Sequence, residues 1–217
     1  MSVLSQGEAL DAGIQALGLA LSPEQGRQLL AYLGLIGKWN KVYNLTAVRE
    51  PAEMLTHHLL DSLAALGPLQ RHLSAQGLQH ASLLDVGSGA GLPGIVFAIG
   101  CPDLQVSCVD AVSKKAAFIQ QAAGELGLKN LRGVHARVES LTGPFDVVCS
   151  RAFASLVDFT AWSRQTLAPA GVWLAMKGKH PAEELAALPE QVQVFHVEPL
   201  SVPGLQAERC LVWMRTV

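Results

Sequence analysis

The fold of this chain of 217 residues is best predicted from one stretch, Leu83-Leu84-Asp85-Val86-Gly87-Ser88-Gly89-Ala90-Gly91-Leu92-Pro93-Gly94-Ile95. Its first residues are mostly apolar and β-prone, which predicts a buried strand that stops in a glycine-rich turn. Pro93 is tolerated in the first turn of a helix, and the apolar residues that follow predict that a helix begins there. A strand, a bare turn and a helix N-terminus together let the backbone approach a nucleotide-like ligand closely.

A second acidic residue narrows the class of ligand. The run reads Asp-x-Gly-x-Gly-x-Gly and lacks the lysine and hydroxyl residue of a triphosphate-binding loop. Asp110 ends the next strand-like run, 23 residues after Gly87. A carboxylate about 20 residues after such a turn lies at the tip of the second strand, where it can accept hydrogen bonds from both ribose hydroxyls.

S-adenosylmethionine and NAD both carry a ribose of this kind. The dinucleotide fingerprint requires Gly-x-Gly-x-x-Gly, whereas Asp85 and the Gly-x-Gly-x-Gly order favour S-adenosylmethionine. We therefore expect an S-adenosylmethionine-dependent methyltransferase. A dehydrogenase and an ordinary glycine-rich turn are the alternatives.

Strand and helix patterns alternate from Ser82 onwards. The predicted strands cover residues 82–86, 105–109, 132–136, 145–149, 171–176, 191–198 and 209–215. Helical patterns separate the first five strands, which predicts a parallel, doubly wound, Rossmann-like sheet. No helix-length pattern joins the last two, so we expect an antiparallel pair at the end of the sheet. A seven-stranded, mostly parallel α/β sheet of this kind is the architecture of class I S-adenosylmethionine-dependent methyltransferases.

The residues before the sheet are predicted to be helical. The segment Ser22-Pro23-Glu24-Gln25 has the pattern of a capping box, and apolar residues follow it at helical spacing toward Trp39. A second helix is expected from near Pro51 through Leu63, and the connecting segment 38–46 mixes aromatic, amide and basic residues. We expect residues 1–80 to form an N-terminal helical extension and residues 81–217 the methyltransferase domain.

Composition limits the compartment and the partners. Half of the residues are hydrophobic, yet no apolar run approaches the roughly 20 residues that span a bilayer, and no signal segment is recognised. The cysteines show no metal-ligand or disulfide pattern; they are Cys101, Cys108, Cys149 and Cys210. We expect a reduced, cytoplasmic protein without metal or membrane contact, and a monomer. The net charge of −2 requires any contact with RNA to rely on a local basic patch or on a large, preformed target.

The ends of the later strands supply further candidates. Val138 and Glu139 follow the third strand, where they can meet an adenine ring or simply begin a solvated helix. Arg151 follows the fourth strand, which lacks the Asn/Asp-Pro-Pro-Tyr/Phe box that grips an exocyclic or amide nitrogen. Cys149 has no neighbouring proline, so a buried strand residue is favoured over a nucleophile. Lys177 follows the fifth strand and can contact an anion or reach solvent.

The chain resembles the bacterial small-subunit ribosomal RNA guanine-N7 methyltransferases, also called the glucose-inhibited division protein B family. The resemblance covers residues 39–177. It rests on the segments Trp39–Thr46, His58–Leu63, Asp85–Gly94, Ser150–Leu156 and Met176–Gly178. Family members often have proline where this chain has Ala90, a departure that leaves the turn intact.

The resemblance implies methyl transfer from S-adenosylmethionine to N7 of a guanine, of the guanine 527 type, in the 530 loop of 16S ribosomal RNA within small-subunit particles. It also implies a set of cofactor contacts: Gly87, Ser88, Gly89, Leu92, Asp110, Val138, Glu139 and Arg151. We expect Arg151 to act in the active centre, in an orienting or anion-anchoring role. The alternative is a methyltransferase of the same fold that acts on a small molecule or a protein.

Basic and aromatic residues near the first long helix are candidates for RNA contact. We expect Lys38, Lys41, Tyr43 and Arg49, together with Lys177, to line the approach of the RNA, with Tyr43 or Trp39 available for stacking on a base. A purely structural role in helix capping and packing is the equal alternative.

Overall fold

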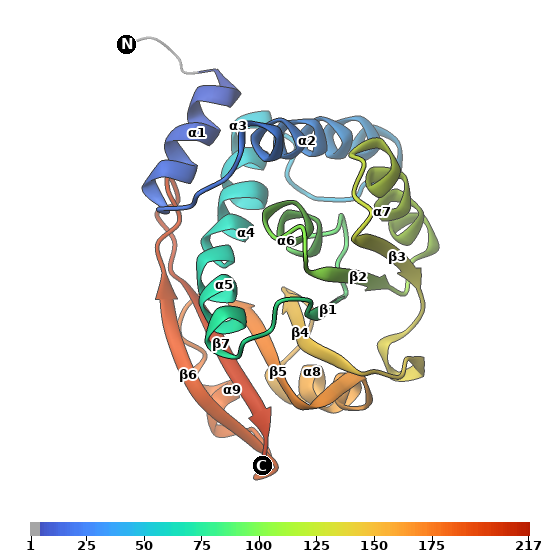
Figure 1. Cartoon of the computed structure of the whole chain (residues 1–217), viewed down its shortest axis with the longest axis vertical. Helices are drawn as coiled ribbons and strands as arrows, with labels where there is room; N and C mark the ends of the chain where they lie inside the picture. The colour runs from blue at the N-terminus through green and yellow to red at the C-terminus, as the bar shows by residue number, and fades with distance from the viewer. Residues whose placement is uncertain (1–4) are drawn as a thin grey trace.

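The computed structural model describes residues 5–217, which fold around one seven-stranded sheet of order β3-β2-β1-β4-β5-β7-β6 (Figure 1). The strands are β1 (Ser82–Val86), β2 (Gln105–Asp110), β3 (Leu131–His135), β4 (Phe145–Arg151), β5 (Leu167–Lys177), β6 (Val192–Leu200) and β7 (Arg209–Thr216). The first five pair in parallel, and β7 is antiparallel to both β5 and β6. Both the seven predicted strands and the reversed final pair are confirmed.

Helices precede the sheet and connect its strands. Before the sheet lie α1 (Gln6–Ala16), α2 (Pro23–Tyr43), α3 (Pro51–Met54), the π-helical turn η1 (Leu55–Leu60), α4 (Asp61–Ala64) and α5 (Leu66–Ala75). Between the strands lie α6 (Gly94–Gly100), α7 (Ser113–Glu125), the 3-10 turn η2 (Val138–Ser140), α8 (Leu156–Ser163), the 3-10 turn η3 (Arg164–Thr166) and α9 (Ala182–Ala186).

The predicted start of α2 is confirmed, but its end lies later than expected. Ser22 and Gln25 form the capping box, with the Ser22 N–H donating to Gln25 Oε1 at 2.7 Å. The helix continues to Tyr43 and ends where Asn44 adopts a left-handed backbone conformation. Residues 38–43 are therefore helical rather than part of a connecting segment, which brings their basic side chains onto one helix.

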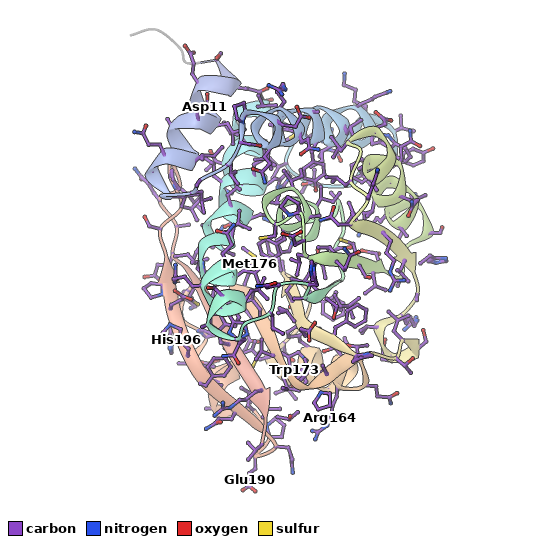
Figure 2. All side chains as sticks on the ribbon, viewed as in Figure 1. Asp11, Arg164, Trp173, Met176, Glu190 and His196 are labelled. Atoms are coloured by element: carbon purple, nitrogen blue, oxygen red, sulfur yellow. The ribbon has the colours of Figure 1, made fainter. Side chains whose placement is uncertain are left out.

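The two faces of the sheet bury different sets of residues, as the period of two along a strand requires. On one face, Leu83, Val106 and Val147 pack in a core formed with α2, α4, α5, α6 and α7. On the other face, Leu84 and Val148 pack in a second core beneath α8. Figure 1 shows α2, α6 and α7 on one side of the central strands and α8 on the other. Among the side chains labelled in Figure 2, the buried Trp173 and Met176 lie within the molecule and the exposed Glu190 lies at its tip.

A side chain from the N-terminal helices reaches directly into the glycine-rich turn. Tyr32, on α2, is fully buried, and its hydroxyl donates to the Ala90 carbonyl at 2.6 Å. Residues of α2 and α5 belong to the same core as residues of β1 and α6. The expected boundary near residue 80 stays a prediction, and residues 1–4 of the expected extension lie outside the described residues.

Replacing Tyr32 by Phe tests this connection. The variant leaves the buried Ala90 carbonyl without its donor, so we expect the free energy of unfolding to fall by about 1–2 kcal/mol. Urea denaturation of wild type and Y32F measures the difference, and equal midpoints would show that the bond contributes nothing.

Candidate functional site

The turn at residues 87–91, here called the glycine turn, is built from residues with left-handed backbone conformations. Gly87, Gly89 and Gly91 have φ values of 65°, 59° and 85°. A Cβ on Gly87 would lie 2.2 Å from the ring of Phe153, so no side chain fits there. A Cβ on Gly89 would meet no atom within 4 Å, because this glycine faces open space at the end of β1. The turn therefore offers bare backbone to a ligand.

Two carboxylates hold the glycine turn and the segments beside it. Asp110 Oδ2 accepts a hydrogen bond from the Gly89 N–H at 3.0 Å, and its Oδ1 accepts one from the Val112 N–H at 2.8 Å. Asp85 Oδ2 accepts from the Gly94 N–H at 2.9 Å, at the start of α6. Asp110 thus fixes the turn itself at Gly89, Asp85 fixes the backbone just after the turn at Gly94, and Asp110 lies at the end of β2 as expected.

Asp85 is completely buried, and this burial changes its chemistry. Loss of solvation raises the pKa of its carboxyl group to about 7, and the Gly94 N–H only partly opposes that rise. The thiols of Cys108 and Cys149, on the two neighbouring strands, lie 3.9 and 3.8 Å from its oxygens. Burial also raises the pKa of the Cys149 thiol well above its ordinary value, which disfavours a thiolate nucleophile.

Two cavities meet at Gly87 on the carboxyl-end edge of the sheet. The larger, of about 530 Å³, is lined by the predicted residues Gly87, Ser88, Gly89, Leu92, Arg151 and Lys177. The smaller, of about 210 Å³, is lined by Gly87, Asp110, Val138 and Glu139. The aromatic ring of Phe153 packs against Gly87 and also lines the smaller cavity. Every predicted cofactor contact thus lines one of two adjoining cavities.

This arrangement suits a ligand with a nucleoside at one end and a charged group at the other. The smaller cavity offers the Asp110 carboxylate and Glu139, which accept hydrogen bonds from hydroxyl and amine groups. The larger offers the open backbone at Gly89 and the guanidinium of Arg151. S-adenosylmethionine has this chemistry, with a ribose and an adenine at one end and a carboxylate at the other.

Two charged residues of the larger cavity, Asp61 and Arg209, are absent from the residues predicted from the sequence. Arg151 donates to Asp61 Oδ2 at 2.8 Å and to the His57 carbonyl at 2.7 Å. Arg209, at the start of β7, donates to Asp61 Oδ1 at 2.8 Å. Asp61 lies within the segment that carries the resemblance, but its partners are 90 and 148 residues away along the chain. No local pattern links the three.

A buried histidine forms another part of the cavity wall. His58 Nε2 lies 2.9 Å from the Thr46 hydroxyl, and burial together with the Arg151 charge lowers the pKa of His58 to about 4. His58 is thus neutral at neutral pH. Its Nδ1 has no hydrogen-bond partner among residues 5–217.

The expected RNA contacts fall into two groups. Lys38, Lys41 and Arg49 line a separate hollow of about 700 Å³ beside α2. Tyr43 is partly exposed; its ring centroid lies 5.1 Å from that of Trp39.

Lys177 differs from these residues because its ammonium is already engaged. It donates to the Ala154 carbonyl at 3.0 Å and to Glu184 at 2.8 Å. Its expected role in RNA contact therefore stays a prediction, with a structural role visible beside it.

Within residues 5–217, no three His, Cys, Asp or Glu side chains are grouped so that they could hold a metal ion. In the same part of the chain, every helix is too short or too polar to cross a bilayer.

Comparisons with known proteins agree with this geometry. The sequence profile of the family described as "rRNA small subunit methyltransferase G" matches residues 25–212. Two curated proteins called "Ribosomal RNA small subunit methyltransferase G" are similar over nearly the whole chain. The protein of Acidovorax sp. (strain JS42) is 68% identical over 100% of both chains. That of Polaromonas sp. (strain JS666 / ATCC BAA-500) is 69% identical over 95% of this chain and 92% of its own.

Solved structures show the same fold at low sequence identity. TrmN from Thermus thermophilus matches 75% of this chain and 53% of its own, with a TM-score of 0.56 and 18% identity. An Aquifex aeolicus structure described as a SAM-dependent methyltransferase matches 77% of this chain and 99% of its own, also with a TM-score of 0.56 and 18% identity. These matches establish the class I methyltransferase fold.

The pKa of Asp85 predicts a pH dependence of stability. The raised pKa means that between about pH 4 and 7 the folded protein keeps a proton that the unfolded chain has lost. Wild type should therefore lose about 1.4 kcal/mol of unfolding free energy per pH unit in that window from this group, and D85N should not. Urea denaturation from pH 4.5 to 7.5 measures the difference, with D103N as a control at an exposed carboxyl. Parallel curves for wild type and D85N would contradict the prediction.

Proposed function

The chain belongs to the rRNA small subunit methyltransferase G family, and on that basis we propose that it transfers a methyl group from S-adenosylmethionine to N7 of a guanine in the 530 loop of 16S ribosomal RNA. The observation that carries the proposal is the joining of two cavities at Gly87, one with the carboxylate of Asp110 and the other with Arg151. When bound, the cofactor supplies an activated methyl group on a sulfonium.

Methylation of guanine N7 requires no general base from the protein. Guanine N7 has a free lone pair and carries no proton at neutral pH, so no side chain has to remove one. The residues of the site therefore act by holding the two reactants in line and by excluding water. His58 fits this role because its lowered pKa leaves a neutral imidazole in the wall of the cavity.

Electrostatics favours a positioning role for Arg151. The purine gains positive charge as N7 takes the methyl group, so a cation placed against the base would oppose the reaction. The Arg151 guanidinium is held by Asp61 and by the His57 carbonyl at the cavity wall. From there it can bind the carboxylate at the amino-acid end of the cofactor.

The RNA reaches the cavity across the segment that follows α2. Asn40 accepts the Thr46 N–H at 2.9 Å and donates to the Val48 carbonyl at 3.3 Å, so it holds this segment in place. Thr46 lines the larger cavity, whereas Arg49 lines the basic hollow together with Lys38. Segment 44–49 contributes to the walls of both the hollow and the cavity, so an RNA strand bound in the hollow through its phosphates lies beside the cavity that would receive a flipped base.

The substrate is RNA within a small-subunit particle or its precursor. Such a large, preformed target needs only a local basic surface on the protein, so a net charge of −2 does not prevent binding. The protein acts as a monomer, and it works in the cytoplasm, where those particles are found. The alternative, a methyltransferase for a small molecule or a protein, is favoured only by the near-neutral charge.

Loss of the gene tests the reaction directly. We expect 16S RNA from a deletion strain to lack one N7-methylguanine in the 530 loop, and wild-type protein to restore it. A G87V variant should fail to restore it, because its side chain would collide with Phe153 in the centre of the site. Mass spectrometry of RNA fragments measures the modification. An unchanged N7-methylguanine content in the deletion strain would overturn the assignment.

Charge removal tests the RNA surface separately. The K38Q/K41Q double variant should bind small subunits several-fold more weakly, and the slope of log affinity against log salt concentration should become shallower by up to about two. Cofactor affinity should stay unchanged, because neither lysine lines the two cavities. K129Q is the matched control, since Lys129 is exposed near the amino ends of the strands, whereas both cavities lie at their carboxyl ends. A salt-dependence slope equal to that of wild type would contradict the proposal that Lys38 and Lys41 bind RNA phosphates.

A further inference from the structure

One buried carboxylate bridges the two guanidiniums of the larger cavity. The Asp61 side chain is 5% exposed, and each of its oxygens accepts a hydrogen bond at 2.8 Å, Oδ2 from Arg151 and Oδ1 from Arg209. Both arginine side chains keep partial exposure toward the cavity, at 20% and 23%. A bridge of this geometry fixes the orientation of two long side chains at once.

The backbone around Asp61 is shaped for the same contact. The π-helical turn η1 (Leu55–Leu60) ends directly before Asp61, and within it the His57 carbonyl accepts the second hydrogen bond of Arg151 Nη1. π-turns are rare and frequent at functional sites. Arg151 is thus held by an acid and a carbonyl that one turn of the chain presents together.

The charges at this wall do not balance. Two guanidiniums share one carboxylate, and Lys115 and Lys177, which also line the cavity, have acidic partners of their own in Asp110 and Glu184. Arg209 makes one further hydrogen bond, from Nη1 to the Glu208 carbonyl. The outer nitrogens Nη2 of both arginines make no hydrogen bond within residues 5–50 and 53–217, so this wall keeps a surplus positive charge and free donors.

We propose that Asp61 is a positioning residue for methyl transfer: by bridging Arg151 and Arg209 it sets the direction of both guanidiniums and prevents a free anion from bridging them instead. The inference rests on the proposed function, because it assumes that Arg151 binds the cofactor. Asp61 itself touches neither reactant in this account and acts through the arginines.

Substitution of Asp61 by asparagine separates charge from shape. The amide side chain of the D61N variant has one acceptor oxygen, and its N–H groups face the second guanidinium, so only one of the two arginines keeps its bond. The guanidinium that loses its bond to residue 61 then changes its orientation. Without the negative charge between them, Arg151 and Arg209 can together bind an oxyanion such as sulfate. Glutamate at the same position keeps the charge but is longer by one methylene group.

The experiment compares wild type, D61N and D61E with a matched control, E198Q. Glu198 also accepts from an arginine, Arg71, at 2.9 Å, but it lies outside both cavities. The readouts are kcat and KM for methylation of small subunits from the deletion strain, calorimetric affinity for S-adenosylhomocysteine, and inhibition by sodium sulfate at constant ionic strength.

We expect D61N to lower kcat at least tenfold and to be inhibited by sulfate at a concentration at least fivefold lower than wild type. We expect D61E to recover part of kcat and to show the sulfate sensitivity of wild type, and E198Q to match wild type throughout. If D61N does not fold, D61E decides: its kcat should still fall by about threefold or more, and a kcat equal to wild type overturns the inference.

Two results contradict the inference while leaving the proposed function intact. One is wild-type kcat in D61N. The other is a loss of kcat in D61N without greater sulfate sensitivity, which would indicate a merely structural carboxylate. If wild type itself binds S-adenosylhomocysteine but methylates no ribosomal RNA, the proposed function fails instead, and the inference that rests on it falls as well.

Discussion

The site depends on a turn with positive φ angles, a backbone conformation that residues with a side chain rarely adopt. Gly87, Gly89 and Gly91 adopt left-handed conformations within five residues, and the turn stays in that shape because its N–H and carbonyl groups are bound from several sides. Asp110 accepts the Gly89 N–H, and Tyr32 donates to the Ala90 carbonyl. The bare turn and its supports therefore form one unit, and the N-terminal helices are part of it.

The fold was predictable because its signals are local. Each strand is a short apolar run bounded by turn residues, and successive residues such as Leu83 and Leu84 do face different cores. The glycine turn, Asp110 and the residues after β3 and β4 were also predictable, because ligands of a parallel sheet bind beyond the carboxyl ends of its strands. The order of the glycines and Asp85 already favoured S-adenosylmethionine as the ligand, and the resemblance then indicated the substrate.

The remaining parts of the site were not predictable, because they depend on contacts between distant segments. Asp61 meets its two arginines across 90 and 148 residues, and Arg209 begins a strand whose neighbours follow only from the complete sheet order. The π-helical turn before Asp61 leaves no distinct periodicity in the sequence. The end of α2 was misplaced for a related reason: only the left-handed Asn44 stops the helix, and asparagine is compatible with several other conformations.

One measurement tests the central claim, that the glycine turn and Asp110 form an adenosyl-binding site. Isothermal titration calorimetry of the purified protein with S-adenosylhomocysteine should show one binding event per chain for wild type, with an affinity at least tenfold weaker for D110N. Binding that is absent from folded wild-type protein, or that is equally tight in D110N, would contradict the account.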